Sequence, residues 1–241
     1  KMSGFLLNAD KSYQFTCRLG ITTTTGDAEG EAIATRPVGV LSRELVDAAL
    51  RRFTGVIQQI PPMYSALKRN GQPLYKLARK GIEVEREPRE VTIHELRLLR
   101  LEGEELECEM RCTKGTYVRA LAVDLGEALG CGAHIAALRR TAVEPYDATR
   151  MVTQEALCER AERGLAALDE LLLPLDSAVA QWPAVRVLAD SAFYLRQGQP
   201  VLVPRAPTQG WVRLYLGDQQ FLGLGEIIDD GRVAPRRLLA C

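Results

Sequence analysis

Apolar and polar positions alternate near the start of the chain, and this alternation predicts a β-strand. The apolar positions are Tyr13, Phe15, Cys17 and Leu19, and polar residues occupy the positions between them. Successive side chains of a strand point to opposite faces of its sheet. One face of this strand is therefore expected to pack into a core, while the other face contacts water.

A second alternating stretch predicts a β-hairpin. Residues 91–101 and 105–113 flank the turn residues Glu102-Gly103. Two period-2 stretches separated by a glycine-containing turn are typical of paired antiparallel strands. In the second arm the apolar positions alternate with charged ones, which predicts one buried and one exposed face. The apolar positions of this arm are Leu106, Cys108, Met110 and Cys112.

Helical periodicity appears in several other segments. Ser42 is a suitable N-cap for a helix whose apolar residues recur every three or four positions and which ends at Gly55. A short helix is expected from Pro73 to Gly81, because proline suits the first position of a helix. Further helices are expected at residues 117–129, 133–140 and 152–173.

The character of the sequence changes near residue 184. From there to the end lysine is absent, and short apolar stretches are separated by glycine and proline. This pattern is typical of a small, mostly β domain. The predicted fold class is therefore α+β, with a mainly antiparallel sheet and flanking helices over residues 1–180 and a small β domain over residues 184–241.

Composition narrows the class of protein. The chain has 241 residues, of which 46% are hydrophobic, and no apolar run approaches the ~18 residues that span a bilayer. The six cysteines and two histidines are scattered without metal-ligand spacing, so neither a metal nor a cofactor is expected. Reduced thiols favour the cytoplasm. Because nothing in the sequence demands a dimer, we expect a monomer that does not bind membranes.

Charge is balanced overall, with 31 basic and 31 acidic residues, but it is distributed unevenly. The stretch from Tyr64 to Gly81 contains basic residues and no acid, and Tyr75 lies among them. RNA binding uses such a combination of phosphate contacts and aromatic stacking surfaces. The alternative is an ordinary solvated face. The basic residues of this stretch are Lys68, Arg69, Lys76, Arg79 and Lys80.

Residues 112–126 carry the most specific chemistry of the chain. They lead from the end of a strand through a glycine turn into an apolar helix, with Lys114, Tyr117 and Arg119 at the junction. Because a buried guanidinium needs an anionic partner, Arg119 predicts a carboxylate or phosphate nearby. Asp124, the nearest acid along the chain, is poorly placed on a helix to pair with Arg119. The alternative is that Arg119 extends into solvent.

Six segments in a fixed order carry a further signal. They are Asp10-Lys-Ser-Tyr13, Gly20-Ile-Thr-Thr-Thr-Thr-Gly-Asp-Ala-Glu-Gly30, Pro61-Pro-Met-Tyr-Ser-Ala-Leu-Lys68, Gly71-Gln-Pro-Leu-Tyr-Lys-Leu-Ala-Arg79, residues 112–126, and Gly130-Cys-Gly-Ala-His-Ile-Ala-Ala-Leu-Arg-Arg140. Together they resemble the bacterial tRNA pseudouridine synthases of the B type, essentially from end to end. The resemblance implies conversion of uridine-55 in the tRNA T loop to pseudouridine. It also implies a pseudouridine synthase catalytic domain over residues 1–180 and a PUA-type RNA-binding domain over residues 184–241.

The resemblance also implies roles for individual residues. Tyr13 would stack on a uridine flipped into a cleft and transfer a proton. Tyr117 and Leu138 would line the same pocket, and Arg119 would hold the nucleophilic aspartate. His134 is expected to be structural, because the chemistry requires nothing of it. The implied partner is tRNA, bound through its T loop and T stem. Its phosphates would be contacted by Lys68, Lys76, Arg79, Lys80, Lys114, Arg139, Arg140, Arg236 and Arg237.

The sequence departs from the family in one respect. The nucleophilic aspartate of the family lies in a Gly-His-Thr-Gly-x-Leu-Asp-Pro motif before the Asp-Lys-x-Tyr segment, and the 241 residues contain no such motif. Asp10 and Asp27 lack its flanking residues. We therefore expect the sequence to begin after the catalytic loop, and the chain in this form not to turn over.

Three hypotheses remain open from the sequence. The first is an RNA-modifying isomerase whose parent protein is active. The second is a non-catalytic tRNA-binding or RNA-folding module, because binding does not need the nucleophile. The third is a small-molecule α/β enzyme with a basic surface, although no glycine-rich phosphate loop or metal cluster supports it.

Overall fold

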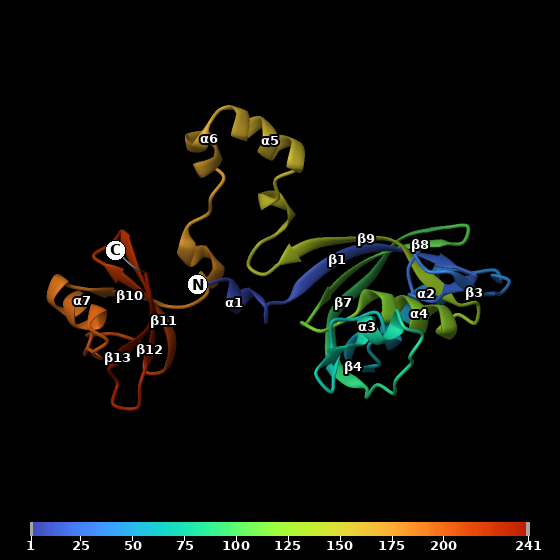
Figure 1. Cartoon of the computed structure of the whole chain (residues 1–241), viewed down its shortest axis with the longest axis horizontal. Helices are drawn as coiled ribbons and strands as arrows, with labels where there is room; N and C mark the ends of the chain where they lie inside the picture. Colours follow the sequence, from blue (N-terminus) through green and yellow to red (C-terminus); the bar gives the residue numbers. More distant parts are fainter. Residues whose placement is uncertain (1, 240–241) are drawn as a thin grey trace. The chain divides into compact units, whose positions relative to one another are not determined.

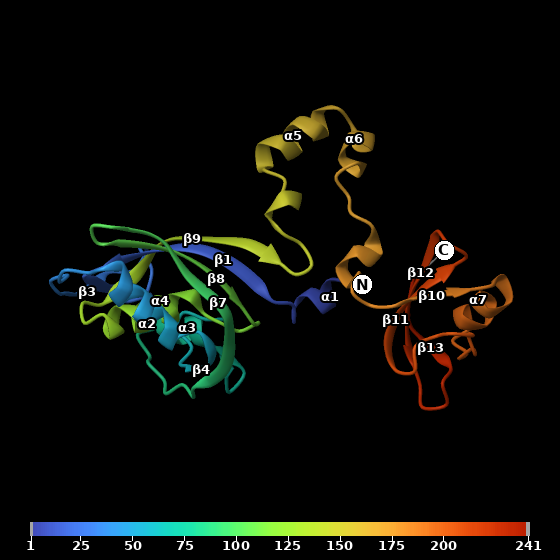
Figure 2. The same cartoon turned by 180° about the vertical axis from the view of Figure 1, so that it is seen from behind.

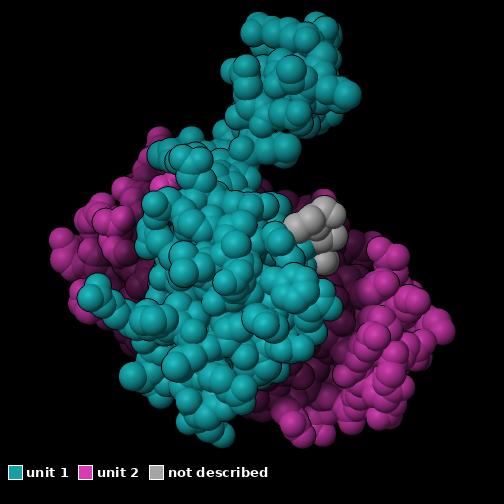
Figure 3. All heavy atoms as spheres, turned by 90° about the vertical axis from the view of Figure 1, so that its left-hand side faces the viewer, with its two compact units in different colours: residues 1–7, 149–241 teal, residues 8–148 magenta. Residues whose placement is uncertain are grey.

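A computed structural model describes residues 2–239, so that Lys1, Ala240 and Cys241 lie outside the described residues. The chain forms two compact units, which are described separately. Residues 8–148 make up one unit, and residues 1–7 together with 149–241 make up the other (Figure 3).

The unit of residues 8–148 is built on a five-stranded antiparallel sheet with the strand order β4-β7-β8-β1-β9. The alternating segments of the sequence form its centre, which confirms the predicted strand and hairpin. The strands are β1 (Lys11–Leu19), β4 (Gly55–Gln59), β7 (Arg89–Glu102), β8 (Glu105–Cys112) and β9 (Ala133–Val143).

Two helices, α2 (Arg43–Arg52) and α4 (Val118–Ala128), cover one face of this sheet (Figures 1 and 2). Ser42 caps α2 as predicted, because its hydroxyl oxygen accepts a hydrogen bond from the Leu45 amide at 3.3 Å. The alternating apolar residues of β8 are buried against these helices, as are those of β1 except Tyr13, which is half-buried. Burial of this apolar surface is the main force that fixes α4, and therefore its first turn, on the sheet.

The opposite face of the sheet is polar and carries cross-strand ion pairs. The guanidinium of Arg97 lies beside the Glu109 carboxylate, and that of Arg100 lies 3.1 Å from Glu107. Both glutamates, Glu107 and Glu109, lie on β8. Their exposed pairing explains how β8 can carry a charge at every second position, since those positions face water.

Short elements surround the main sheet. The pair β2–β3 lies beside the start of β9, and the pair β5–β6 precedes the short helix α3. Pro73 is the N-cap of α3 rather than its first helical residue. The bounds are β2 (Ile21–Thr23), β3 (Ala32–Thr35), β5 (Lys68–Arg69), β6 (Gln72–Pro73) and α3 (Leu74–Ala78).

The predicted helix at residues 133–140 is wrong, because this segment is the edge strand β9. It pairs with β1 along most of its length, with Phe15 opposite Leu138 and Leu19 opposite Ala133. Its alanine-rich sequence favours a helix locally. Pairing with a strand more than a hundred residues away overrides that preference, as tertiary context often does.

The other unit is centred on a four-stranded sheet with the order β10-β11-β12-β13 and the helix α7, which confirms a small, mostly β C-terminal domain. Strands β10 and β11 are parallel and the remaining pairs are antiparallel. The bounds are β10 (Ala184–Val187), α7 (Ala189–Arg196), β11 (Gly210–Leu216), β12 (Gln220–Ile227) and β13 (Val233–Leu238).

The N-terminal helix α1 (Ser3–Leu6) belongs to the same unit as the C-terminal sheet. Phe5 packs edge-on against Trp182 at a centroid distance of 4.9 Å and against Trp211 at 5.5 Å. The Arg237 guanidinium lies 4.9 Å from the centroid of the Phe5 ring. Residues before β1 are therefore packed with residues near the end of the chain.

The predicted single helix over residues 152–173 is also wrong. Gly164, with a φ of 98°, separates two shorter helices, α5 (Gln154–Glu162) and α6 (Leu165–Asp169). A positive φ is not compatible with a continuing right-handed helix, and glycine adopts it without steric cost. Within residues 2–239, no helix is both long and apolar enough to cross a membrane.

The two compact units do not follow the expected division at residues 180–184. Packing places residues 149–180 with the C-terminal sheet rather than with the larger unit. The assignment of residues 1–180 and 184–241 to two functional domains stays a prediction.

Candidate active site

Arg119 lies in the first turn of α4 and is held by three partners from distant parts of the chain. Its Nη1 donates to the Asp27 carboxylate at 2.9 Å and to the Thr25 carbonyl oxygen at 3.2 Å. Its Nη2 donates to the Tyr64 carbonyl oxygen at 2.7 Å. Arg119 therefore does not extend into solvent. The predicted anionic partner exists, and it is Asp27.

Both carboxylate oxygens of Asp27 are occupied. Oδ2 accepts from Arg119, while Oδ1 accepts from the Thr25 hydroxyl and from the Glu29 amide. The Asp27 side chain is 25% exposed and that of Arg119 is 24% exposed, so the pair is partly shielded from water. The three donors fix the position of this carboxylate.

Arg119 keeps donors beyond these three bonds. A guanidinium has five N–H groups. Among residues 2–239, no acceptor occupies Nε or the second hydrogen of Nη2. The side chain is therefore fixed by Asp27 and two carbonyl groups, while it can still hold a further anion or polar group.

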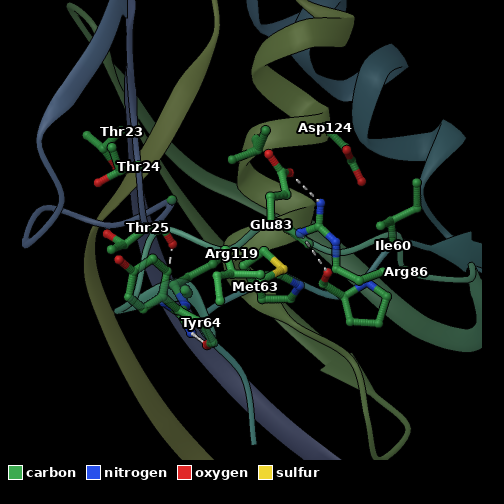
Figure 4. A pocket seen from close by; sticks show the side chains of 18 residues that line it. Thr23, Thr24, Thr25, Ile60, Met63, Tyr64, Glu83, Arg86, Arg119 and Asp124 are labelled. Carbon is green, nitrogen blue, oxygen red and sulfur yellow. Dashed lines mark hydrogen bonds and ion pairs between the residues drawn. The ribbon is translucent and has the colours of Figure 1, made fainter. Parts of the chain in front are cut away.

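Arg119 also lines a cavity of about 400 Å³ (Figure 4). Met63, Tyr64 and Thr25 lie on the same side as Arg119, and Asp124 lies across the cavity near the ion pair of Glu83 and Arg86. Burial, and then the nearby Glu127 carboxylate, raises the pKa of Asp124 above its usual value. Of the predicted site residues, Arg119 alone lines this cavity within the described part of the chain.

Tyr117 precedes α4 and is fixed through its backbone. The Tyr117 amide donates to Oε1 of Gln59 at 2.8 Å, and Nε2 of Gln59 donates to the Tyr117 carbonyl oxygen at 3.1 Å. Gln59 is only 2% exposed, so its side-chain amide is shielded from water and pairs with the Tyr117 backbone instead. The clamp joins the end of β4 to the start of α4 and sets the direction in which the helix begins.

Tyr13 and Leu138 come together through the pairing of β1 with β9. Phe15 lies opposite Leu138 and Tyr13 lies opposite Arg140, so that Leu138 is one diagonal step from Tyr13. Tyr13 is half-buried, and Leu138 is 47% exposed. Burial, and then the neighbouring Cys112 thiol, raises the pKa of the Tyr13 hydroxyl, while Arg140 acts to lower it.

Some of the predicted phosphate-binding residues are exposed, and others already contact another residue of the protein. Lys68, Lys76, Arg79 and Lys80 are exposed, around α3. Lys114 donates to Asn8 at 2.6 Å. In the other unit, Arg236 donates to Glu226 at 2.8 Å, and Arg237 lies over the Phe5 ring. Arg139 and Arg140, on β9, are also exposed. The group around α3 and these two arginines are therefore accessible to phosphates, whereas Lys114, Arg236 and Arg237 already have partners within the protein.

Sequence reasoning missed Asp27 and Gln59. Neither had a signal in its local pattern, because Asp27 lies in a polar turn and Gln59 at the end of a short strand. Their partners are 92 and 58 positions away in the sequence. The structural role predicted for His134 is confirmed, since Nδ1 lies 2.9 Å from the Ile21 carbonyl oxygen and the residue is 8% exposed.

A metal centre is not formed by the described residues. Between residues 2 and 239, no group of three or more histidine, cysteine, aspartate or glutamate side chains could hold a metal ion.

Comparison with known proteins decides the family. Residues 1–118 match the N-terminal domain of TruB family pseudouridylate synthases, and residues 119–180 match the tRNA pseudouridylate synthase B C-terminal domain. Residues 183–239 match the pseudouridine synthase II TruB C-terminal model. The tRNA pseudouridine synthase B of Nitrosococcus oceani is 56% identical over 99% of this chain and 78% of its own length. The chain belongs to the TruB family of pseudouridylate synthases.

A further relative and two solved structures are also similar to this chain. The tRNA pseudouridine synthase B of Pseudomonas aeruginosa is 54% identical over 99% of this chain and 79% of its own length. A Cbf5–Nop10–Gar1 complex contains a chain with a TM-score of 0.70 at 20% identity, covering 98% of this chain and 68% of that one. An H/ACA ribonucleoprotein bound to a substrate RNA gives a TM-score of 0.71 at 18% identity, covering 100% of this chain and 69% of that one. These two likenesses confirm the fold.

Proposed function

We propose that the protein isomerises uridine in tRNA to pseudouridine, and that its target is uridine-55 of the T loop. The observation that carries the proposal is the family match, since a tRNA pseudouridine synthase B is 56% identical over 99% of the chain. The arrangement around Arg119 supports it, because the reaction requires an oriented charged group beside a cleft.

The isomerisation determines which residue types are useful. The C1′–N1 bond of uridine breaks, the base rotates, and a C1′–C5 bond forms. N1 gains a proton and C5 loses one, so the reaction needs neither an oxidant nor a cofactor. A carboxylate assists loss of the base from the sugar, and a guanidinium keeps that carboxylate charged and oriented.

Arg119 is proposed to orient the reacting carboxylate. Asp27 is better suited to positioning Arg119 than to attacking the sugar, because both of its carboxylate oxygens already accept hydrogen bonds from residues of the protein. The remaining donors of Arg119 are proposed to hold the nucleophilic aspartate of the family motif, which is not among the 241 residues.

Tyr13, Tyr117 and Leu138 are proposed to receive the flipped uridine. A tyrosine offers a ring for stacking and a hydroxyl for proton transfer, which suits Tyr13. Its position beside the exposed Leu138 side chain gives an apolar surface of two residues for the base. Tyr117 is held at the start of α4 by Gln59, in the same turn as Arg119.

The tRNA backbone is proposed to contact the exposed basic residues around α3. Lys76, Arg79 and Lys80 are exposed, and Arg79 stacks on the Tyr75 ring at 5.6 Å from its centroid. Contacts of this kind supply affinity that depends on salt. The C-terminal sheet is proposed to act as a PUA-type RNA-binding domain, and the protein is proposed to act as a cytoplasmic monomer without membrane contact.

The position of the modified uridine tests the proposal. An unmodified tRNA transcript is incubated with the full product of the gene, and pseudouridine is mapped by carbodiimide modification followed by primer extension. A stop at position 55, absent from a transcript that carries cytidine there, is the expected result. Pseudouridine at other positions only would contradict the choice of uridine-55. Tight tRNA binding without any pseudouridine would favour the non-catalytic module.

A further inference from the structure

Residues 133–140 form the strand β9 rather than the expected helix, and this places the neighbouring Arg139 and Arg140 on opposite faces of the sheet. Arg140 lies opposite Tyr13 and Arg139 lies opposite Gln14, without an irregularity between these pairs. Because side chains of a strand alternate between faces, Arg140 shares the face of Tyr13 while Arg139 points to the other face of the sheet. The two arginines therefore cannot serve the same part of a bound RNA in the same way.

Within residues 2–239, the titratable groups that act on the Tyr13 hydroxyl are Cys112 and Arg140. On β8, Met110 lies opposite Tyr13 and the Cys112 thiol is nearby. On β9, Arg140 lies opposite Tyr13 on the same face, and it acts to lower the pKa of the Tyr13 hydroxyl. On β1 itself, Lys11 precedes Tyr13 on the same face and donates to the Ala9 carbonyl oxygen at 2.6 Å. Arg140 is thus the cation that faces this hydroxyl from the neighbouring strand.

We propose that Arg140 is a positioning residue for the Tyr13 hydroxyl in uridine isomerisation, separate from the phosphate-binding arginines. The inference rests on the proposed function and adds a residue to its site. It is carried by the register of β1 with β9, which places the two side chains opposite each other on one face.

The chemistry of a guanidinium determines which side chain can donate a hydrogen bond and which can accept it. Arginine has only donors, so in a contact between the two side chains Arg140 would donate and the Tyr13 oxygen would accept. When the C1′–C5 bond has formed, the proton on C5 must leave as an electron pair returns to the ring. A Tyr13 phenolate would take that proton and become a neutral phenol, which later loses the proton to water.

The positive charge of Arg140 favours the phenolate form that this step uses. Burial and Cys112 raise the pKa of Tyr13, and the Arg140 charge opposes them. Without Arg140 the pKa of Tyr13 would rise further. Less phenolate would then be present at neutral pH, and a higher pH would be needed to form the same amount.

The test compares single-turnover rates of the full gene product across pH with saturating tRNA. We expect Arg140→Ala to slow turnover about tenfold to a hundredfold at neutral pH, part of the usual contribution of a proton-transfer group. The loss should shrink as pH rises, and Arg140→Lys should recover part of the rate. Arg139→Ala should weaken tRNA binding and leave the shape of the pH profile unchanged.

A second measurement separates failure of this inference from failure of the proposed function. In the 241-residue chain with 13C-labelled tyrosine, NMR titration should show a higher pKa for Tyr13 in Arg140→Ala than in the unchanged chain. In the full product, Arg140→Ala should have no further effect once Tyr13→Phe is present. Turnover with an unchanged rate and pH profile in Arg140→Ala would overturn the role of Arg140 alone. Absence of turnover in the unchanged protein would overturn the proposed function instead.

Discussion

At the scale of single residues, Arg119 is the side chain on which the proposed site depends. It belongs to α4, but Asp27, Thr25 and Tyr64 from two other segments hold it. An unpaired guanidinium at this depth would be costly, so these contacts both stabilise Arg119 and set its orientation. The same side chain keeps donors for another group, which is what a residue that orients a nucleophile requires.

Replacement of Arg119 should separate catalysis from binding. In the full gene product, Arg119→Ala is expected to lower turnover by about a thousandfold, as loss of a preorganised charge does in other enzymes. tRNA affinity should change by less than about threefold, because Arg119 is not among the residues proposed to contact phosphates. Single-turnover kinetics and filter binding measure the two quantities.

Arg119→Lys provides the matched control for charge. A lysine keeps the positive charge but cannot reproduce the fork geometry, so most of the activity should still be lost. Near-normal turnover in Arg119→Ala would remove the proposed role. A parallel loss of tRNA binding would show that the residue supports the fold or the RNA contact rather than the nucleophile.

At the scale of elements, the packing of α4 on β9 places the Arg119 turn. Gly126 faces β9 so closely that a Cβ atom there would lie 2.2 Å from the Ala133 amide nitrogen. Its side of α4 also carries Leu121, Ala122 and Leu125, which are fully buried. A helix that approaches the sheet this closely has no room for a larger residue at that position.

Gly126→Ala should therefore destabilise the protein although alanine favours helices. We expect a loss of about 2–3 kcal/mol in the free energy of unfolding, the typical cost of overpacking a core. Urea denaturation followed by circular dichroism measures it. Gly39→Ala is the control, because a Cβ at Gly39 meets no atom within 4 Å. Equal stability of both variants would contradict the packing described here.

The basic stretch around α3 is a second element with a separable role. Replacing Lys76, Arg79 and Lys80 together with alanine should weaken tRNA binding and reduce the slope of log affinity against log salt by about 2–3, one unit or slightly less for each lost phosphate contact. A variant that removes the exposed charges of Arg51, Arg52 and Arg163 should keep the original slope. An unchanged slope in the first variant would show that the stretch is an ordinary solvated face.

The sequence predicted those elements whose pattern is local. Three such patterns each lie within about ten residues of sequence and predict their element correctly. They are the alternation in β1 and β8, the Ser42 cap of α2 and the apolar face of α4. β9 was not predictable in this way, because its alanine-rich segment becomes a strand only through pairing with β1. The break at Gly164 was missed because one glycine within a helical pattern is often tolerated.

The site was predictable only in part for the same reason. The need of Arg119 for an anion followed from its chemistry, but the choice of Asp27 depends on a contact across 92 residues. Tyr13 and Leu138 have ordinary core patterns and entered only through the family resemblance. That Arg139 and Arg140 lie on opposite faces could not be inferred while the segment was expected to be helical.

At the scale of the whole molecule, the chain passes between its two units twice. Residues 1–7 and 149–241 form one unit, and residues 8–148 form the other. Both tryptophans, Trp182 and Trp211, lie in the first of these and pack against Phe5. Tryptophan fluorescence therefore reports on that unit alone, while circular dichroism reports on both.

Phe5→Ala should destabilise the tryptophan-containing unit selectively. The expected loss is about 1–3 kcal/mol, because a partly buried aromatic contact is removed. The urea midpoint followed by tryptophan fluorescence should fall, and the change should be absent in Leu7→Ala, whose side chain is 72% exposed. An unchanged fluorescence midpoint in Phe5→Ala would contradict the packing of the N-terminal helix against these rings.

The central proposal for the whole molecule is that this fold presents uridine in tRNA for isomerisation. Tritium release from tRNA labelled at C5 of uridine tests that claim most directly, because C5 loses its hydrogen only when it becomes bonded to the sugar. We predict that the full gene product releases tritium from an unmodified tRNA transcript, up to one equivalent per tRNA. Tight binding of the transcript without release of tritium would contradict the proposal that the protein isomerises uridine in tRNA.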